Sequence, residues 1–543
     1  MTALPSRTPV LIVGAGPTGL TLAIALRRQG VECLLIDRLR EPLPWSRALG
    51  MHARTLEILD ALDVLEPVSE RCLVQKGVNV YGRRGRLFRL DLTTLEAPHP
   101  YVLSCPQAEL EAVLAEQFVA QGGHLLRGCE LLGLTQSEGG VLTRVRDADG
   151  EHSLTCNFLV GCDGASSRVR TQLGFSFEGV SYPDHFLLAD LDIDWPLSRE
   201  DSHGFLLPEG ALIAIPMPEG WRLIINQRLN GEQTEPTLED FRVRLAQCLG
   251  SAPPLSEPRW ISRFSIHRRL VNHYRRNRVF LAGDACHIQS PLGAQGMNTG
   301  IADAFNLGWK LALYLRGHAD GALLDSYERE RRPVARKMLY AVDILSRSSF
   351  ARNPLFVALR DLLLMLAGRR RFVGQRLLRK VSQLEVSYRQ GPLAGAASPS
   401  KRGMPDAGDR APDAQLSEIE GSVVQLHAAL RRGKSLLLIS VPTNPGHAET
   451  LTLYGLLDRV CQEFAELISV HLILPGSSLP EHLAYAAEYQ VTLWQDKEGQ
   501  FASRYSSPGG VWLIRPDGHI GWRGELGNAD HLVGWCERWL RRR

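Results

Sequence analysis

The chain has 543 residues, 44% hydrophobic and 22% charged, and its 62 basic and 59 acidic residues leave a net charge of +3. This length predicts about three packed units, and so small a charge excess excludes the strongly basic surface of a nucleic-acid-binding protein. The first ten residues lack the apolar core of a signal peptide, and the apolar stretch 355–366 is charge-interrupted and too short to span a bilayer. We therefore expect a cytoplasmic protein without nucleic-acid or membrane partners, although peripheral membrane contact stays open.

Ten cysteines lie along the chain without a CxxC pair or any spacing typical of metal ligands, so we expect no metal site. Because no secretion signal precedes them, we expect reduced thiols. Arginine runs at 369–371 and 541–543 are interpreted as solvated helix ends.

The pattern of residues 9–37 predicts a strand, a glycine loop, a helix and a second strand. Gly14, Gly16 and Gly19 form a GxGxxG motif, whose glycines permit a tight turn, close approach of a pyrophosphate and close helix packing. Asp37 ends the second strand at the distance expected of a carboxylate that binds a ribose. The motif predicts a dinucleotide site but does not distinguish FAD from NAD.

The rest of the chain divides by changes in its pattern. A helix is expected at 107–121, a meander of strands with Pro-Glu-Gly turns at about 180–270, a buried strand at 278–285 and helices at about 299–316 and 325–390. A stretch rich in Pro, Gly, Ala and Asp predicts a linker before a small α/β domain. We predict these boundaries: a first nucleotide-binding part at 1–178, a sheet domain at 179–272, a return and helical segment at 273–390, a linker at 391–414 and a last domain at 415–543.

Two later motifs narrow the choice of nucleotide. In FLVGCDGASSRVR, at 158–170, a buried strand ends at Asp163 and Gly164, which taken alone is also consistent with an ordinary turn. In the segment 278–311, a buried strand delivers Asp284, whose carboxylate can accept hydrogen bonds from a ribityl chain. The glycines and amides of 291–298 then precede a helix start, which stabilises negative charge on a reduced flavin.

Together, GAGPTG, CDGASSRVR and AGDACHIQSPLGAQGMNTGIADAFNLGWKL resemble the signature set of the single-component FAD-dependent aromatic hydroxylases, which are class A flavoprotein monooxygenases of the para-hydroxybenzoate, phenol and polyketide hydroxylase type. The resemblance spans about residues 9–390, and the tail is similar to the thioredoxin-like domain of the phenol and polyketide hydroxylase branch. It implies an α/β fold with a Rossmann-like FAD-binding domain, an inserted β-sheet substrate domain, a helical segment and a C-terminal thioredoxin-like domain. Since the tail lacks CxxC, its role is expected to be structural or oligomeric.

The resemblance assigns cofactor contacts residue by residue. The pyrophosphate, ribose, ribityl and isoalloxazine contacts that it implies are Gly14, Gly16, Pro17, Thr18, Gly19, Asp37, Arg38, Arg47, Gln107, Asp163, Gly164, Asp284, Pro291, Gly293, Gly296, Met297 and Asn298. Two positions depart from the family, which usually has Glu at Asp37 and Gly at Ala294. We expect the extra methyl at Ala294 to narrow the loop without abolishing binding.

The implied reaction begins with reduction of FAD by NADPH or NADH. Reduced flavin and O2 then form a C4a-hydroperoxide, which transfers one oxygen atom to an aromatic carbon. No protein nucleophile is required, so no residue is assigned as catalytic with certainty. His52 and His287 are secondary candidates, against readings as a surface-helix and a packed histidine. Leu49 falls where phenol hydroxylase has an acid, so either the proton is removed elsewhere or the substrate is not a simple phenol.

The meander supplies the expected substrate wall, and its candidates are Phe205, Leu207, Ile213, Ile215 and Met217, with Pro291 at the floor. Each is also consistent with an ordinary sheet core, and Arg222 reads more readily as a sheet-surface residue than as a ligand. We expect a bulky, hydrophobic or polycyclic phenolic substrate and a monomer or homodimer. Epoxidation, Baeyer–Villiger oxidation, oxidative decarboxylation and an FAD reductase that does not activate oxygen remain open.

Overall fold

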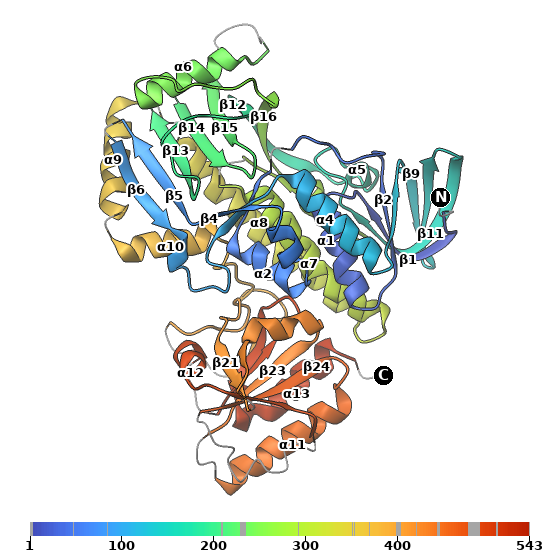
Figure 1. Ribbon diagram of the computed structural model, residues 1–543. Coiled ribbons are helices and arrows are strands. Elements are labelled where there is room, and N and C mark those ends of the chain that lie inside the picture. The colour runs from blue at the N-terminus through green and yellow to red at the C-terminus, as the bar shows by residue number, and fades with distance from the viewer. Residues whose placement is uncertain are drawn as a thin grey trace.

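The computed structural model describes residues 4–46, 48–83, 85–207, 210–228, 235–290, 293–349, 351, 353–368, 370–397, 403–419, 421–442, 446–475, 489–505 and 509–541. Within them the chain forms three eight-stranded sheets and one three-stranded sheet. Figure 1 shows three units, with the C-terminal one, coloured orange to red, below the other two.

The first sheet is the mostly parallel sheet predicted for a nucleotide-binding domain. Strand β1 (Arg7–Val13) pairs in parallel with β2 (Cys33–Asp37) and with β11 (Gly150–Gly161), and β18 (Val279–Leu281) returns beside β11. The strands β1 and β2 are almost wholly apolar because helices cover them. The other strands are β8 (His124–Arg127), β9 (Glu130–Ser137), β10 (Gly140–Asp147) and β17 (Arg275–Arg276). The main helices of this unit are α1 (Pro17–Arg28), α2 (Ala53–Ala61), α3 (Leu65–Ser69), α4 (Gln107–Ala120), α5 (Arg168–Gln172) and α7 (Gln295–Leu315).

The second sheet contains the predicted meander and adds strands from elsewhere in the chain. Its order is β19-β16-β12-β15-β14-β13-β5-β6, antiparallel except where β13 meets β5. Helix α6 (Leu238–Leu249) covers one face with Phe241 and Leu245. The strands are β5 (Gly77–Gly82), β6 (Gly85–Asp91), β12 (Phe177–Leu191), β13 (Asp201–Leu207), β14 (Gly210–Pro216), β15 (Trp221–Arg228), β16 (Trp260–Val271) and β19 (His287–Ile288).

Three helices follow the long helix α7. They are α8 (Gly321–Ser349), α9 (Pro354–Gly368) and α10 (Arg371–Val381). Helix α9 lies at the outer edge of the second sheet, beside β6 (Figure 1). There it covers an edge strand that would otherwise present unpaired backbone groups.

The C-terminal unit is thioredoxin-like. Its sheet places β23 (Ser435–Ser440), β24 (Ile468–Leu474) and β25 (Thr492–Gln495) in parallel. Strands β26 (Gly510–Ile514) and β27 (Ile520–Glu525) then run antiparallel beside β23. The remaining elements are β20 (Gly395–Ala396), β21 (Gln415–Glu418), β22 (Val423–Gln425), α11 (His447–Glu463), α12 (Gln500–Tyr505) and α13 (Ala529–Trp539).

The described residues of the segment 391–414, predicted as a linker, make fixed contacts. Strand β20 adds to the C-terminal sheet by pairing with β27. The N–H of Gly408 donates to Ile520 O at 2.7 Å, and the Arg410 guanidinium donates to the buried Glu57 carboxylate of α2. The segment therefore joins the C-terminal unit to the nucleotide-binding unit through buried contacts.

The expectation of uniformly reduced thiols is wrong, because Cys72 and Cys105 form a disulfide. They lie next to the three-stranded sheet of β3 (Gly50–Met51), β4 (Leu73–Gln75) and β7 (Val102–Ser104), in which Leu73 pairs with Ser104. This register brings the two cysteines together across 33 residues of sequence. No local spacing encodes such a pairing.

Candidate functional site

The glycine loop has the close contacts that its motif predicts. Gly14 has a φ of +108°, and a Cβ there would lie 2.3 Å from Cys162 O. A Cβ on Gly19 would lie 1.9 Å from Gly14 O, so only glycine permits this contact between loop and helix. At Gly16, by contrast, an added Cβ would meet only Glu111 Oε1, at 3.8 Å, so backbone approach is open there. Helix α1 has no side-chain cap and no acid in its first turn, which leaves its N-terminus suited to an anion.

Asp37 holds the loop from the neighbouring strand. Its carboxylate accepts hydrogen bonds from the N–H of Ala15 at 2.7 Å and from the N–H of Leu39 at 2.8 Å. The side chain is only half-buried, so its carboxylate can also receive a ribose hydroxyl. The next residue, Arg38, is exposed. Arg47 lies outside the described residues.

Gln107 forms a chain of polar side chains beside the loop. It accepts from Ser46 Oγ at 2.6 Å and donates to Glu111 Oε1 at 2.6 Å. Burial raises the pKa of Glu111, with a further contribution from Asp37. Sequence reasoning did not assign Glu111 to the site, although its position one helical turn after Gln107 is a usable signal.

Asp163 has its carboxylate occupied by protein. It accepts from Ser167 Oγ at 2.5 Å and from the backbone N–H groups of Arg168 and Val169, and so caps α5. Burial nevertheless raises its pKa. Gly164, at a φ of +76°, makes the turn that starts this cap. The Asp163 side chain therefore orients the loop, and only its remaining lone pairs could accept a hydrogen bond from a ligand.

Asp284 is different, because its side chain is solvent-exposed and accepts no hydrogen bond from the described part of the chain. The adjacent Gly283 has a φ of +62°, and a Cβ there would lie 2.5 Å from Thr18 Oγ1. Thr18 is thus a packing contact between the two nucleotide-binding motifs, and Asp284 is a free acceptor beside them.

The loop before α7 starts the helix in a strained conformation. Ala294 caps α7 with a φ of 51° and a ψ of 39°, the left-handed region in which glycine is at ease. Pro291 lies outside the described residues, whereas Gly293 is exposed and Gly296 and Met297 are half-exposed. The helix start has no side-chain cap and no acid in its first turn, so it is free to stabilise an anionic ring edge.

Asn298 is buried, and its side chain is fully used within the protein. Its Oδ1 accepts from the backbone N–H of His52 at 2.9 Å and from Thr55 Oγ1 at 2.6 Å. Its Nδ2 donates to Gly50 O at 2.9 Å and to Ala294 O at 2.6 Å. This side chain therefore fixes the loop, and only its backbone is available to a cofactor.

The reading of His52 as a surface-helix residue is wrong, since only 6% of it is exposed. Its Nε2 lies 2.7 Å from Gly293 O. Burial lowers its pKa more than this carbonyl raises it, so the ring is neutral and donates to Gly293. His287 is also buried, 2.7 Å from Asp303 Oδ2. This environment agrees with the alternative interpretation of His287 as a packed histidine.

The wall candidates divide between the two faces of the second sheet. Ile213 and Ile215 share a face with Phe186, Phe264 and Ile266. Phe205 pairs with Leu212 and lies on the opposite face, under α6, so the structure does not bring it together with the two isoleucines. Met217 is buried just after β14. The side chain of Leu207 lies outside the described residues.

Arg222 is a polar exception on the apolar face. It lies opposite Ile215 across the β14–β15 pair. It is only 3% exposed, so the expectation of a sheet-surface residue is wrong. Its guanidinium makes two hydrogen bonds of 2.7 Å to Asp190, and its Cζ lies 5.5 Å from the centre of the Trp260 ring. Its Nη1 is buried without a partner among the described residues. A buried unpaired donor beside an apolar wall is suited to an oxygen of a ligand.

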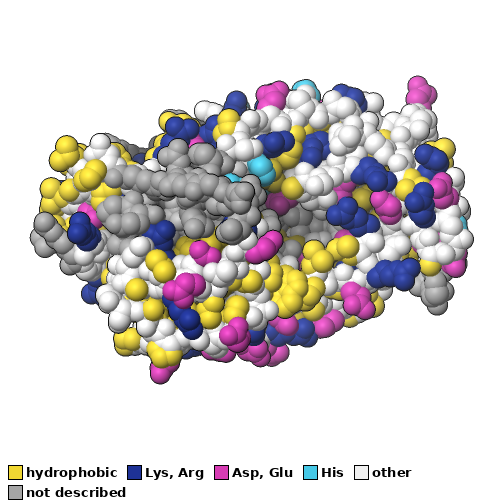
Figure 2. Space-filling view, turned by 90° about the horizontal axis from the view of Figure 1, so that it is seen from above, with side chains coloured by type: hydrophobic (Ala, Val, Ile, Leu, Met, Phe, Trp, Pro, Cys, Tyr) yellow, Lys and Arg dark blue, Asp and Glu magenta, His cyan; other side chains and the backbone are white. Residues whose placement is uncertain are grey.

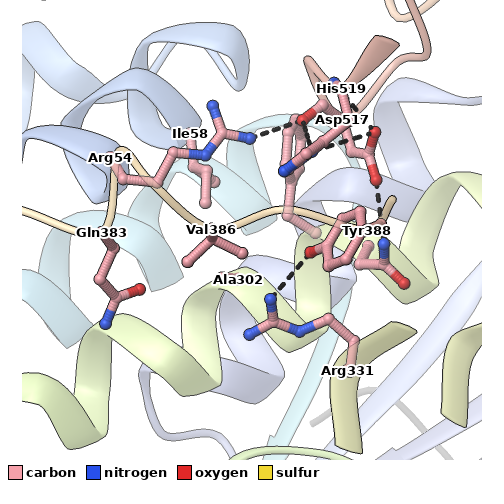
Figure 3. A pocket seen from close by; sticks show the side chains of 11 residues that line it. Arg54, Ile58, Ala302, Arg331, Gln383, Val386, Tyr388, Asp517 and His519 are labelled. Carbon is pink, nitrogen blue, oxygen red and sulfur yellow. Dashed lines mark hydrogen bonds and ion pairs between the residues drawn. The ribbon is translucent and has the colours of Figure 1, made fainter. Parts of the chain in front are cut away.

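A second cluster of charged residues lies between the C-terminal unit and helices α7 and α8. Arg515 donates to Glu330 at 2.6 Å and 3.0 Å, and Lys310 donates to Glu330 at 2.7 Å. Asn306 also donates to Asp517 at 2.9 Å. Figure 3 shows the adjoining cavity, where Arg331 bonds Tyr388 and Arg54 bonds Asp517. With room for about one water molecule, this cavity is no substrate site.

These observations fit a bound FAD. Two helix N-termini lack protein caps, Gly16 leaves space for a pyrophosphate, and the Asp284 carboxylate is unused by the protein. The residues suited to hold the group follow the carboxyl ends of the neighbouring strands β18, β11, β1 and β2 of the first sheet, or lie at the start of α7.

Comparisons with known proteins agree with this geometry. A family model described as an FAD binding domain matches residues 7–342, and one described as the C-terminal part of aromatic-ring hydroxylases matches 404–542. The chain is 35% identical to a 12-dehydrotetracycline 5-monooxygenase/anhydrotetracycline 6-monooxygenase of Streptomyces rimosus subsp. rimosus, over 97% of this chain and 99% of that one. It is 31% identical to pentachlorophenol 4-monooxygenase of Sphingobium chlorophenolicum, over 96% and 95%. The solved structure of an anhydrotetracycline hydroxylase from Streptomyces rimosus superposes with a TM-score of 0.77 at 29% identity, covering 98% of this chain and 99% of that one.

Proposed function

The chain belongs to the family of FAD-binding aromatic-ring hydroxylases, and we propose that it hydroxylates a bulky, polycyclic phenol with NADPH or NADH as the reductant. It is an FAD-dependent monooxygenase. When bound, FAD accepts hydride from a nicotinamide and activates O2 for transfer of one oxygen atom. The relatives are named for a tetracycline in one case and a chlorinated phenol in the other, so the substrate class has to be argued from this chain's own residues.

The observation that carries the proposal is the make-up of the sheet face beside β14. Ile213 and Ile215 lie there with Phe186, Phe264 and Ile224, a broad wall that favours a large apolar ligand. The buried ion pair of Arg222 and Asp190 interrupts it. We propose that the spare Nη1 of Arg222 donates a hydrogen bond to a carbonyl or phenolic oxygen of the substrate and so fixes which ring carbon faces the flavin.

The cofactor roles follow from which groups the protein leaves unused. We propose that Asp284 accepts from the ribityl hydroxyls and that Asp37 accepts from the ribose. The uncapped start of α7 would stabilise negative charge on the flavin ring. His52 and Asn298 would position the cofactor loop rather than contact the cofactor with their side chains, because both side chains hydrogen-bond the 293–294 turn.

Proton removal from a phenol is not assigned to His52. Its neutral ring is engaged with the carbonyl of Gly293, and Leu49 is buried and cannot take a proton. We propose instead that the Nη1 hydrogen bond of Arg222 stabilises the phenolate and so lowers the phenol's pKa, and that solvent water takes the proton.

The test is a product analysis with isotopically labelled O2, NADPH and a panel of polycyclic phenols. One labelled oxygen on an aromatic carbon is expected. Insertion into a ring carbon–carbon bond, an epoxide or loss of CO2 would identify one of the alternative outcomes. Peroxide alone across the panel would contradict oxygen transfer to a substrate and favour a reductase.

Two variants separate the assigned roles. Asp284→Ala is expected to lose FAD on purification, and a fully yellow variant would refute the ribityl assignment. Arg222→Met is expected to keep FAD but to lower kcat/KM by ten- to a hundredfold, about the value of one charged hydrogen bond. The control is Arg259→Met, which breaks an exposed ion pair with Asp192 just beyond the ends of β16 and β12 and should leave turnover unchanged.

A further inference from the structure

Helices α9 and α10 carry a cluster of exposed apolar side chains. Those of α9 are Leu355, Phe356, Leu359, Leu362, Leu363 and Leu366, and those of α10 are Phe372, Val373 and Leu377. Leu355 is 83% exposed and Phe372 is 73% exposed. In Figure 2 apolar side chains gather at the left end of the molecule, where Figure 1 places α9. Single exposed apolar residues are ordinary, but a contiguous cluster marks an interaction surface.

Helix α9 is oriented against the usual rule for a surface helix. Its two buried side chains are Val357 and Arg360, and the Arg360 guanidinium donates to Ser348 O and to Asp361. The leucines at 355, 359, 362, 363 and 366 therefore form one outward stripe at helical spacing. Burying a charged residue while exposing a row of leucines indicates that the outer face is normally covered.

The same two helices are strongly basic. Residues 354–381 contain seven basic residues and one acidic residue, a net charge of +6, whereas the whole chain carries +3. Arg370, Arg376, Arg379 and Lys380 are exposed beside the apolar side chains of α10. Asp361, the one acid, is already paired with Arg360. An apolar face flanked by basic residues is the pattern of a helix that lies in a membrane interface.

We propose that α9 and α10 dock this protein on the surface of an anionic lipid bilayer. The leucines and Phe372 would enter the acyl boundary, and the basic residues would contact lipid phosphates. Charge complementarity favours lipid over a second copy of the chain. Symmetric pairing of this surface would face Arg376 and Lys380 with their own copies, and no free acid of α9 or α10 would compensate them.

The position of the surface gives the docking a use. Leu378 of α10 packs with Ala53, which begins α2 directly after His52, and Gln295 Nε2 of α7 donates to Val381 O at 2.9 Å. The docking surface thus adjoins the flavin-facing loops and the edge of the substrate sheet. A bilayer there would concentrate an apolar ring compound next to its site. In this respect the inference builds on the proposed substrate class, while docking itself does not depend on it.

Docking in this sense requires no spanning segment. Among the described helices, none combines the length and apolar character needed to cross a bilayer. The expectation of no membrane partner rested on that criterion and left peripheral contact open. Arg370, which belongs to the arginine run interpreted from sequence as a solvated helix end, acquires a partner in this proposal.

The experiment is co-sedimentation of the FAD-loaded full-length protein with vesicles of phosphatidylcholine, with or without phosphatidylglycerol. We expect binding to the anionic vesicles that weakens as salt rises, and little binding to phosphatidylcholine alone. Leu355→Glu and Phe372→Glu should each lower the partition coefficient tenfold or more, by about the value of one buried side chain. Arg376→Gln should lower it about fivefold.

The matched control is Leu451→Glu. Leu451 is 60% exposed on α11, in the C-terminal unit, so its change should leave vesicle binding intact. Flavin content and turnover of a soluble phenol are measured for every variant, and these should match the wild type because none of the changed side chains is placed in the catalytic site. Hydroxylase activity without vesicle binding would overturn the docking proposal alone.

Three results would overturn the proposal. The first is absence of binding to anionic vesicles. The second is equal binding by Leu355→Glu and the wild type. The third is a dimer in light scattering that Leu355→Glu dissociates while vesicles are ignored, which would assign the surface to a second copy of the chain.

Discussion

Replacing Arg515 by Met should weaken the attachment of the C-terminal unit to helices α7 and α8. Arg515 is 1% exposed and donates two hydrogen bonds to Glu330 and one of 3.0 Å to Asp517 Oδ1. Two cations, Lys310 and Arg515, here balance two anions, Glu330 and Asp517. Burial opposes ionisation of Glu330, but Arg515 and Lys310 outweigh it and hold the pKa of Glu330 below its usual range.

The magnitude follows from the charges left behind. Met has a similar reach to Arg but no charge, so the variant keeps most of the packing and leaves one uncompensated negative charge in the interior. Breaking a buried ion pair by removing one partner costs about 3–5 kcal/mol. Since Glu330 keeps its bonds to Lys310 and Asn306, we expect a loss near the lower value, about 3 kcal/mol.

The assay is urea unfolding at pH 7, followed by tryptophan fluorescence and by release of bound flavin. Arg541→Met is the control, because Arg541 joins the same two units through a solvent-exposed pair with Asp320, 3.3 Å apart. That pair should contribute about 0–1 kcal/mol. If Arg515→Met and Arg541→Met were equally stable, the buried cluster would not be what holds the units together, and the reasoning would be refuted.

Three further changes test the local arguments. Ala294→Gly should raise the free energy of unfolding by about 1 kcal/mol, because it relieves an alanine in the left-handed conformation. Ala302→Gly within the same helix should lower the free energy of unfolding by a similar amount. If thermal unfolding ranked the two variants in the opposite order, the backbone strain assigned to Ala294 would be contradicted. Gly14→Ala should abolish FAD binding, since its methyl would lie 2.3 Å from Cys162 O, and a purified variant with full flavin content would show that the loop can shift. Burial disfavours ionised Glu57, but Arg410 and Arg54 hold the pKa of Glu57 well below 4.5. The ionised carboxylate therefore stabilises the fold fully above pH 4.5, and this stabilisation is lost as the pH falls below that value. Glu57→Gln should be less stable at pH 7, and its melting temperature should fall less steeply with acid in a pH series.

The parts that the sequence predicted are those set by local spacing. The glycines at 14, 16 and 19 and the acid at 37 stand at fixed distances within one strand-loop-helix-strand unit, and their contacts follow from that unit alone. Asp284 is similar, since a strand end delivers its side chain. The succession of strands and helices in the tail likewise predicted a small α/β domain, and the family resemblance identified it as thioredoxin-like.

The parts that failed depend on contacts between distant segments. Alternation along β14 places Ile213 and Ile215 on one face. It does not predict on which face of the sheet Phe205 of the neighbouring strand β13 lies. The burial of His52 and Arg222 depends on loops and strands far away in the chain. The Cys72–Cys105 pair likewise depends on the register of β4 and β7.

We expect the thioredoxin-like unit, which lacks CxxC, to serve this flavoprotein as a structural support. Its cysteines are unsuited to exchange, because burial raises the pKa of the Cys536 thiol to about 12 and also raises the pKa of the Cys461 thiol. The unit supplies Asp517, which accepts from Asn306 on α7, and Arg515, which donates to Glu330 on α8. Glu330 in turn accepts from Lys310 on α7. Lys310 lies fifteen residues after the helix start, or about 22 Å along the axis from the residues proposed to face the flavin. Because a helix is stiff over that length, fixing one end against the C-terminal unit restrains the other, and Arg515→Met should therefore loosen flavin binding as well as lower stability.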